Sequence, residues 1–411
     1  MTDNTKSPFL SKKLSPINGL EPKAPLLRFP GFTCYWKAEK LLDFTSRIMR
    51  KNSNKETELP LTISSKDGLV DQVTFFNKKI SSKDMSGYYL LKKGEFAYNK
   101  SYSNGYDFGS IKRLERYEMG ALSSLYICFS LKKHCSDYIK HYFESLKWYR
   151  QIYIISAEGA RNHGLLNVPT DDFFATRHFL SQNIEEQQKI ADFLSLVDLR
   201  IEKQRQLVES LKKYKRGLLK SIFKGKTANR ILQDCINIGK AGGTPDSANS
   251  SYYNGTIPFL SISDMTVQGK YLNSTEKQIT REGLDNSSAW LVPPKSLIIS
   301  MYASYGLVAI NNIALSTSQA MFNIIPKNEY LYYYLTYLAF TGYYHKMVST
   351  GTQPNLNANK IRNIPIYMPS DTEKQNITKL LTEVDNKVNA ELQYLLLLIQ
   401  TKKAFLQQMF I

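Results

Sequence analysis

The chain has 411 residues, a formal net charge of +18 and 42 % hydrophobic residues. This length predicts two to four domains, and the apolar content is sufficient for packed cores, which excludes a wholly disordered chain. Four scattered cysteines without a C-x2-C pair, and five histidines without a ligand pattern, exclude a disulfide framework and give no zinc site. The positive charge favours a polyanionic partner, although many basic proteins bind no nucleic acid.

The first half of the chain predicts a leader followed by a globular domain. Residues 1–25, rich in Lys, Ser and Pro, are expected to be mobile, and without an apolar stretch they are no secretory signal, so we expect a cytoplasmic protein. Residues 26–183 are expected to form the globular domain. Short apolar runs at Gly87–Asn99 and Ala121–Phe129 are typical of strands joined by turns, and Asp137–Leu146 has a helical pattern.

The rest of the chain predicts a long helix, a second globular domain and a second long helix. The helical segments are residues 184–226 and 370–411, and the domain between them is residues 227–369. Inside that domain, three strand-like runs and one helical patch lie at Thr256–Ile262, Ser296–Met301, Ala320–Ile325 and Tyr330–Phe340.

The two long helices are an internal repeat. Ile184–Phe223 and Asp371–Phe410 superimpose without a gap at an offset of 187 residues. Ten residues recur between them: Glu186, Gln188, Ile190, Leu194, Val197, Asp198, Leu211, Lys215, Leu219 and Phe223 match Glu373, Gln375, Ile377, Leu381, Val384, Asp385, Leu398, Lys402, Leu406 and Phe410. A match of this length indicates duplication of a module that ends in a long helix.

Each repeat carries apolar residues at alternating spacings of four and three over more than four heptads, which predicts a coiled-coil contact. An antiparallel pair would relate the two halves by a pseudo-twofold axis. In the register favoured here, Lys215 faces Glu391, Gln204 faces Lys402, and the other facing residues are apolar; polar pairs of this kind fix register at some cost in stability. Alternatively, Lys215 and Lys402 extend to solvent and set no register.

Several short motifs accompany the repeat: Leu27-Arg28-Phe29-Pro30-Gly31-Phe32 with Trp36, Glu186-Gln187-Gln188-Lys189-Ile190, Gly242-Gly243-Thr244-Pro245, Ile257-Pro258-Phe259-Leu260 and Gly351-Thr352-Gln353-Pro354-Asn355-Leu356. Together they resemble the DNA-specificity (S) subunit of type I restriction–modification systems over essentially the whole chain. The first domain departs from the family pattern, because it lacks Gly-Gly-Thr-Pro after Trp36 and has Arg161-Asn162-His163-Gly164 where Gln353-Pro354-Asn355 stands in the second. This puts the target sequence in doubt and not the family.

The resemblance implies an α+β protein, in which two globular α/β target-recognition domains are separated by two long antiparallel coiled-coil helices. It implies that each domain reads one half of a bipartite site in double-stranded DNA and that the helices set the spacer. It further implies two methyltransferase (M) subunits and restriction/motor (R) subunits as partners. These partners would use S-adenosylmethionine, ATP and Mg²⁺, whereas this chain would bind no cofactor, perform no catalysis by itself and have no membrane contact.

Candidate DNA contacts follow from the chemistry of base edges. Arg and Lys suit guanine, and Asn and Gln suit adenine. Loops that offer such groups beside small residues contain Asn99, Lys100, Ser101, Tyr102, Arg161, Asn162 and His163 in the first domain, and Ser300, Tyr302, Thr352, Gln353, Asn355, Lys360 and Arg362 in the second. For each of them, an exposed loop side chain without a DNA contact is an equally open interpretation.

The sequence predicts no catalytic or metal-binding residue. Gly225-Lys226-Thr227 resembles the end of a P-loop, but Lys220 stands where the first glycine is required. The clustered Tyr332, Tyr333 and Tyr334 have helical spacing, which favours packing in a core or at a subunit contact over stacking on single-stranded bases. The alternative function is a coiled-coil scaffold for protein interactions with only non-specific affinity for DNA.

Overall fold

The computed structural model describes residues 23–78, 81–82, 84–156, 166–302, 304–326, 328–348 and 356–411. The chain forms two compact units. The first takes in the chain up to Lys203 together with Tyr394–Ile411, and the second is Gln204–Gln393. Most of the predicted leader, 1–25, lies outside the described residues, and the five-segment division of the chain stays a prediction.

The β-rich part of the first unit, called here the first domain, contains two four-stranded sheets and a strand pair. One sheet has the order β2 (Thr45–Arg47), β9 (Ile127–Leu131), β6 (Phe96–Asn99), β7 (Ser110–Arg113), and the other β4 (Gly68–Asp71), β3 (Pro60–Ser64), β8 (Met119–Leu122), β5 (Tyr89–Lys92). The pair is β1 (Lys37–Lys40) with β10 (Arg177–Leu180). Short helices connect these strands: α1 (Leu41–Phe44), α2 (Gln72–Phe76), α3 (Ser136–Glu144), α4 (Tyr149–Ile155) and α5 (Thr170–Ala175).

The second domain, the β-rich part of the second unit, repeats this strand order with one additional strand at the edge of one sheet. Its sheets have the orders β12 (Ile238–Ala241), β20 (Met321–Ile325), β17 (Leu297–Ser300), β18 (Val308–Asn311), β14 (Tyr271–Leu272) and β15 (Lys277–Ile279), β13 (Tyr253–Leu260), β19 (Leu315–Thr317), β16 (Leu291–Val292). In each domain two strands distant in sequence pair in parallel, β3 with β8 and β13 with β19. The pair β11 (Arg230–Ile231) and β21 (Pro365–Ile366) corresponds to β1 and β10. The remaining helices are α7 (Ile262–Gln268), α8 (Arg281–Asp285), α9 (Glu329–Phe340), α10 (Tyr343–Met347) and α11 (Ala358–Arg362).

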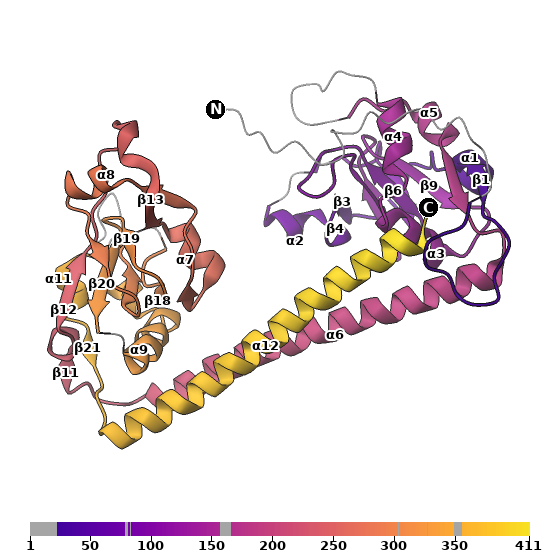
Figure 1. Ribbon diagram of the computed structural model, residues 1–411. Coiled ribbons are helices and arrows are strands. Elements are labelled where there is room, and N and C mark those ends of the chain that lie inside the picture. Colours follow the sequence, from indigo (N-terminus) through magenta and orange to yellow (C-terminus); the bar gives the residue numbers. More distant parts are fainter. Residues whose placement is uncertain are drawn as a thin grey trace. The chain divides into compact units, whose positions relative to one another are not determined.

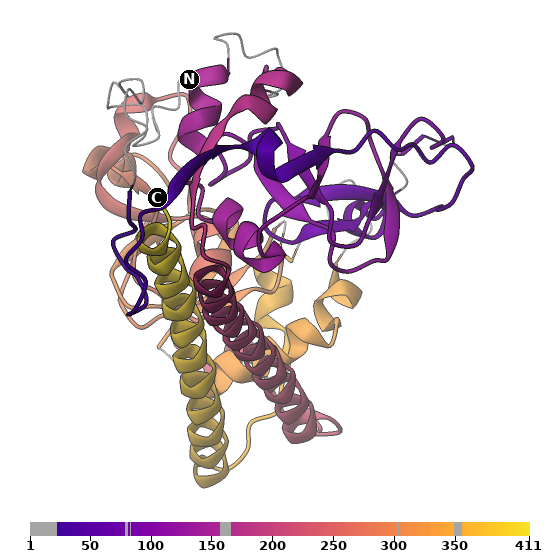
Figure 2. The same ribbon diagram turned by 90° about the vertical axis from the view of Figure 1, so that its right-hand side faces the viewer.

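The two long helices are α6 (Ile184–Phe223) and α12 (Asp371–Met409). The Asn183 side chain caps the start of α6 by accepting hydrogen bonds from the backbone N–H groups of Glu185 and Glu186. The helices lie side by side and antiparallel in both units (Figures 1 and 2). Asp198 contacts Lys402 in the first unit, and Gln204 contacts Glu391 in the second. The predicted fold of two mixed α/β domains with two packed long helices is confirmed.

Most predicted elements are found with small changes. The predicted run Gly87–Asn99 contains two strands, β5 and β6, which belong to different sheets; Gly94, at a φ of +87°, turns the chain between them. Ala121–Phe129 likewise divides into β8 and β9. The clustered tyrosines of α9 are buried, as core packing requires. Within the described residues, no helix is both long and apolar enough to cross a membrane.

The ends of the long helices complete the core of each domain. Ile190, Leu194, Leu406 and Phe410 belong to the main core of the first unit, and Leu219, Phe223, Ile377 and Leu381 to that of the second. These eight residues are four of the repeated pairs found in the sequence. The repeat therefore conserves the contacts by which a domain packs on its helices.

The predicted register of the helix pair is wrong. Lys215 pairs with Asp385 rather than with Glu391, and Gln204 donates a 2.7 Å hydrogen bond to Glu391, the residue expected opposite Lys215. Lys402 pairs with Asp198 instead of Gln204. The physical reason is charge compensation, since this register gives both lysines a carboxylate partner on the opposite helix. The alternative, in which the lysines extend freely to solvent, is wrong as well.

Candidate nucleic-acid interface

In the first domain, four of the predicted contact residues lie at the end of β6 and in the loop that follows it: Asn99, Lys100, Ser101 and Tyr102. The Asn99 side chain accepts a 3.0 Å hydrogen bond from the backbone N–H of Ser101, which turns the chain at the end of the strand. The carbonyl oxygen of Lys100 accepts a 3.0 Å hydrogen bond from the N–H of Leu166. Leu166 is the first described residue after the second predicted segment, Arg161 to His163, which itself lies outside the described residues.

The second domain contains the same connection. Strand β17 ends at Ser300, and the carbonyl oxygen of Met301 accepts a 2.9 Å hydrogen bond from the N–H of Leu356. Leu356 directly follows Asn355. In each domain the loop after the equivalent strand, β6 or β17, is thus bonded to a leucine just beyond the other predicted segment. Six of the predicted residues lie outside the described part of the chain: Arg161, Asn162, His163, Thr352, Gln353 and Asn355.

Aromatic contacts hold each loop to the helix that precedes the second segment. In the first domain the ring of Phe108 packs edge-on against Tyr149 and Tyr153 of α4, with centroids 5.4 and 5.9 Å apart. In the second, the hydroxyl of Tyr305 lies 2.6 Å from Nδ1 of His345 on α10. Loop and helix therefore form one structure at this end of each domain.

Two of the first-domain candidates are available to a ligand to different degrees. The side chain of Tyr102 is 59 % exposed. Lys100 is half-buried, and this burial lowers the pKa of its ammonium group. A partly desolvated cation beside an exposed aromatic ring is suited to a polyanion with flat bases.

Three second-domain candidates are instead used inside the fold. Ser300 is fully buried; its hydroxyl donates to the carbonyl of Ser304 and accepts from the N–H of Leu307, so it is not presented to DNA as expected. Arg362 donates a 2.9 Å hydrogen bond to the carbonyl of Gly239 and lies over the ring of Phe322. Lys360 donates to the carbonyl of Met347. Tyr302 is half-buried and packs against the main core of the second unit.

The sequence interpretation missed His345 and Lys346, which are exposed in the last turn of α10. They lie just before the segment 349–355 that contains Thr352, Gln353 and Asn355. Basic residues in the last turn of a helix also interact favourably with its dipole, so their sequence signal was ambiguous. The Tyr305–His345 contact joins His345 to the loop after β17, and Lys346 is the next residue of the same helix.

The motifs that carry the family resemblance are structural. Glu186, fully buried in the first turn of α6, accepts hydrogen bonds from Arg28 at 2.5 and 3.0 Å, from the Trp36 indole at 3.1 Å and from Ser181 at 2.5 Å. In Gly242-Gly243-Thr244-Pro245, a Cβ at Gly242 or Gly243 would collide with the backbone of Thr317 or Ser288. These glycines allow the close approach of two chain segments.

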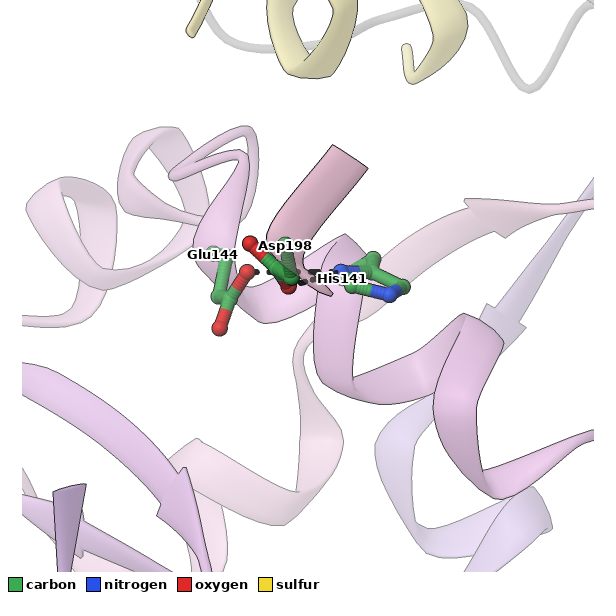
Figure 3. A group of neighbouring side chains, drawn as sticks. All are labelled: His141, Glu144 and Asp198. Carbon is green, nitrogen blue, oxygen red and sulfur yellow. Dashed lines mark hydrogen bonds and ion pairs between the residues drawn. The ribbon is translucent and has the colours of Figure 1, made fainter. Parts of the chain in front are cut away.

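A cluster of titratable groups lies where the first domain meets the long helices (Figure 3). His141 and Glu144 of α3 and Asp198 of α6 have ligand atoms within 4.8 Å of one another, a grouping that the sequence did not predict. Lys402 of α12 lies 2.7 Å from Glu144 and 2.5 Å from Asp198. The ammonium group therefore compensates the charge of both carboxylates.

Comparison with known proteins gives one family. Residues 226–396 match the model of the type I restriction modification DNA specificity domain. The chain is 29 % identical over 152 residues to the specificity subunit of the type I restriction enzyme MjaIX from Methanocaldococcus jannaschii. That match covers 36 % of this chain and 35 % of the relative, so it spans only about a third of the relative's length.

Two solved structures share the fold over nearly the whole chain. One comes from work on complex assembly and conformational transition of the type I R-M system, with a TM-score of 0.59, 17 % identity and coverage of 94 % of this chain and 99 % of the other. The other is the S subunit of a type I restriction-modification system from M. genitalium, with a TM-score of 0.52, 15 % identity and coverage of 95 % and 99 %. At these identities the likeness concerns the fold alone.

Proposed function

Because this chain belongs to the DNA specificity (S) subunits of type I restriction–modification systems, we propose that each of its two domains reads one half of a bipartite site in double-stranded DNA. The long helices fix the untouched spacer between the half-sites. The chain is non-catalytic by itself and supplies sequence specificity to an enzyme whose other subunits methylate adenine or cut DNA.

The recurrence of one loop arrangement in both domains carries this proposal. The bond between Leu166 and Lys100 in the first domain has its counterpart between Leu356 and Met301 in the second. A duplicated module that keeps the same loop end, while the residues on that end differ, is what a two-part reader requires. Each loop end then contacts base edges in the major groove, where all four base pairs are distinguishable.

Charge supports a DNA partner. The net charge of +18 attracts a polyanion through release of condensed counterions. Among the described residues, Lys100 in the first domain and His345 and Lys346 in the second are basic residues in or next to the proposed loop ends. Phosphate contacts from such residues position a protein on DNA, whereas the neighbouring Asn, Gln and Tyr side chains select bases.

The long helices are also suited to protein partners. Nine large apolar side chains on them are exposed: Ile184, Leu196, Leu199, Leu207, Tyr214, Leu380, Leu396, Leu397 and Ile399. Exposed apolar side chains on a helix are typical of contacts with further helices. We assign them to two methyltransferase (M) subunits, with restriction/motor (R) subunits joining the full complex. S-adenosylmethionine, ATP and Mg²⁺ act through those partners.

Methylation profiling tests the proposal directly. The genome of the host is sequenced for modified adenine with and without this chain, in the presence of its M subunits. We expect one bipartite motif to lose modification when the chain is absent. In binding assays with the chain–M complex, a duplex with that motif should bind at least a thousandfold more tightly than a scrambled duplex at physiological salt.

Variants assign the half-sites. Lys100→Ala should weaken binding or relax selectivity at one half-site, and the pair His345→Ala and Lys346→Ala should act on the other. Lys93→Ala is the control, because Lys93 is an exposed lysine that pairs with Glu118 on the surface. Equal affinity for specific and scrambled DNA would contradict the reading of half-sites and favour the alternative function, a coiled-coil scaffold for protein interactions.

A further inference from the structure

The cluster in the first unit joins a domain to an inter-helix ion pair. Asp198 of α6 and Lys402 of α12 form the pair. The first domain adds Glu144, which contacts Lys402 at 2.7 Å, and His141, whose Nδ1 lies 3.3 Å from Glu144 and 3.9 Å from Asp198. Figure 3 shows the Glu144 and Asp198 carboxylates both directed toward His141.

The second unit contains the same Asp–Lys pair, but the residue that the domain adds to it has the opposite charge. Lys215 of α6 pairs with Asp385 of α12, and each residue is the repeat counterpart of one in the first unit. Here the second domain adds a base: Lys270 lies 3.2 Å from Asp385 and donates a 2.8 Å hydrogen bond to the hydroxyl of Tyr333. Tyr333 in turn donates a 2.8 Å hydrogen bond to Asp385.

We propose that the Asp–Lys pair at each end of the helix pair, called here the socket, is a contact site that holds a domain on the helices. A domain can bind the socket in either of two ways: with an acidic residue next to its lysine, or with a basic residue next to its aspartate. The first domain uses the lysine through Glu144, and the second uses the aspartate through Lys270. Glu144 and Lys270 are then positioning residues, because they set how a domain sits on the helices and touch no DNA.

The burial of these groups explains why a charge is needed. The side chains of Lys270 and Asp385 are 8 % and 9 % exposed, and that of Lys402 is 15 % exposed. Burial acts to raise the pKa of Glu144, but the contact with His141 and the charge of Lys402 outweigh it and hold this pKa well below its ordinary value. Burial acts to lower the pKa of Lys402, and the carboxylates of Glu144 and Asp198 outweigh it and raise this pKa. Removing one member leaves a desolvated charge with fewer partners, which is costly.

The proposal makes an unusual prediction about charge reversal. Glu144→Lys gives the first cluster one carboxylate and two lysines, as in the second cluster, with His141 in addition. Asp198 lies within reach of the new ammonium group, since the ligand atoms of the cluster are within 4.8 Å of one another. Glu144→Met removes the charge altogether. We expect backbone amide hydrogen exchange in α3 of the full chain to accelerate about tenfold in Glu144→Met and to remain near the wild-type rate in Glu144→Lys.

Two further variants complete the test. Glu144→Lys combined with Asp198→Asn should lose the protection that Glu144→Lys alone keeps, because no acid then remains for the new lysine. Glu118→Met is the matched control, since Glu118 also pairs with a lysine at 2.6 Å but on the open surface. Should Glu144→Met fail to fold, Glu144→Gln replaces it, with a smaller acceleration expected in the same helix.

Two results would overturn the proposal. Unchanged exchange in α3 of Glu144→Met would mean that the cluster does not seat the domain. Faster exchange in Glu144→Lys than in Glu144→Met would mean that the socket accepts only one sign. The mirror variants Lys270→Met and Lys270→Glu, followed in α9 of the second domain, provide an independent comparison with the same expected order.

Discussion

Lys215 on α6 forms an ion pair with Asp385 on α12, and this pair defines the register of the two helices in the second unit. Both side chains are largely buried. Neighbouring seam residues are apolar, so the ion pair is the feature that a shifted register would lose.

A double-mutant cycle tests this register. We expect the Lys215→Ala and Asp385→Ala changes to be coupled by about 1 kcal/mol or more in the free energy of unfolding, because residues in contact are not additive. The same cycle with Lys215→Ala and Glu391→Ala should be additive within about 0.5 kcal/mol. Urea unfolding of the four chains of each cycle gives both values, and a coupling to Glu391 alone would restore the register expected from the sequence.

Removal of Arg28 should be strongly destabilising. Arg28→Ala leaves the carboxylate of Glu186 buried without its cation, and breaking a buried pair in this way costs about 3 kcal/mol or more. Lys93→Ala also removes one partner of an ion pair, but both partners are exposed, and we expect a change within about 0.5 kcal/mol. Equal losses measured by urea unfolding would show that burial at Glu186 has no energetic effect.

Acid should destabilise the first domain through His178. Its imidazole is buried between the Tyr142 hydroxyl and the Thr176 hydroxyl, each 2.8 Å away, and burial lowers its pKa to about 3. The unfolded chain takes up a proton at this residue below about pH 6.5 while the folded chain does not, so stability falls as the pH drops from 6.5 toward 3.

Through His178, the free energy of unfolding is expected to be about 1.4 kcal/mol lower at pH 5.5 than at pH 7.5. It is measured as the difference in pH dependence of unfolding free energy between the wild-type chain and His178→Gln, which removes the titrating group and cancels the other residues. Parallel pH profiles for the two chains would contradict the assignment of His178 as a buried neutral imidazole.

The Gly-Gly-Thr-Pro motif should not tolerate a side chain. Gly243→Ala places a Cβ against the backbone of Ser288, which cannot move as a flexible side chain would, and we expect a loss of about 2 kcal/mol or more. Gly87→Ala is the control, since its Cβ meets no atom within 4 Å. Thermal unfolding of both variants gives the comparison; a Gly243→Ala midpoint no lower than that of Gly87→Ala would make the motif dispensable for stability.

The long helices were predictable because a heptad pattern over forty residues admits few alternatives. The bounds Ile184–Phe223 agree with α6, and the shared topology of the domains follows from the repeat. The apolar seam alone did not predict the register, because Asp198 and Asp385 lie beside that seam and are the partners of Lys402 and Lys215. Both aspartates recur in the repeat together with Lys215 and Lys402. This joint recurrence was the sequence signal for the Lys215–Asp385 and Lys402–Asp198 pairs.

The candidate site was predictable as a set of loops but not residue by residue. Asn99 is the last residue of β6 and Lys100 begins the loop after it, where the carbonyl of Lys100 accepts a hydrogen bond from the N–H of Leu166. Ser300 has the same sequence context at the end of β17, yet it is buried and fully hydrogen-bonded. A sequence does not show whether the last residue of a strand faces the core, because that depends on the loop which returns beside it.

The division of the helices between the units has a consequence for synthesis on the ribosome. The second unit is one continuous stretch, Gln204–Gln393, and all its core residues are available once that stretch has emerged. The first unit needs Leu406, Met409 and Phe410 to close its core, although most of it is made first. The first unit therefore cannot complete its core until the residues up to 410 have been made. Until then, the apolar residues of this core remain exposed in the nascent chain.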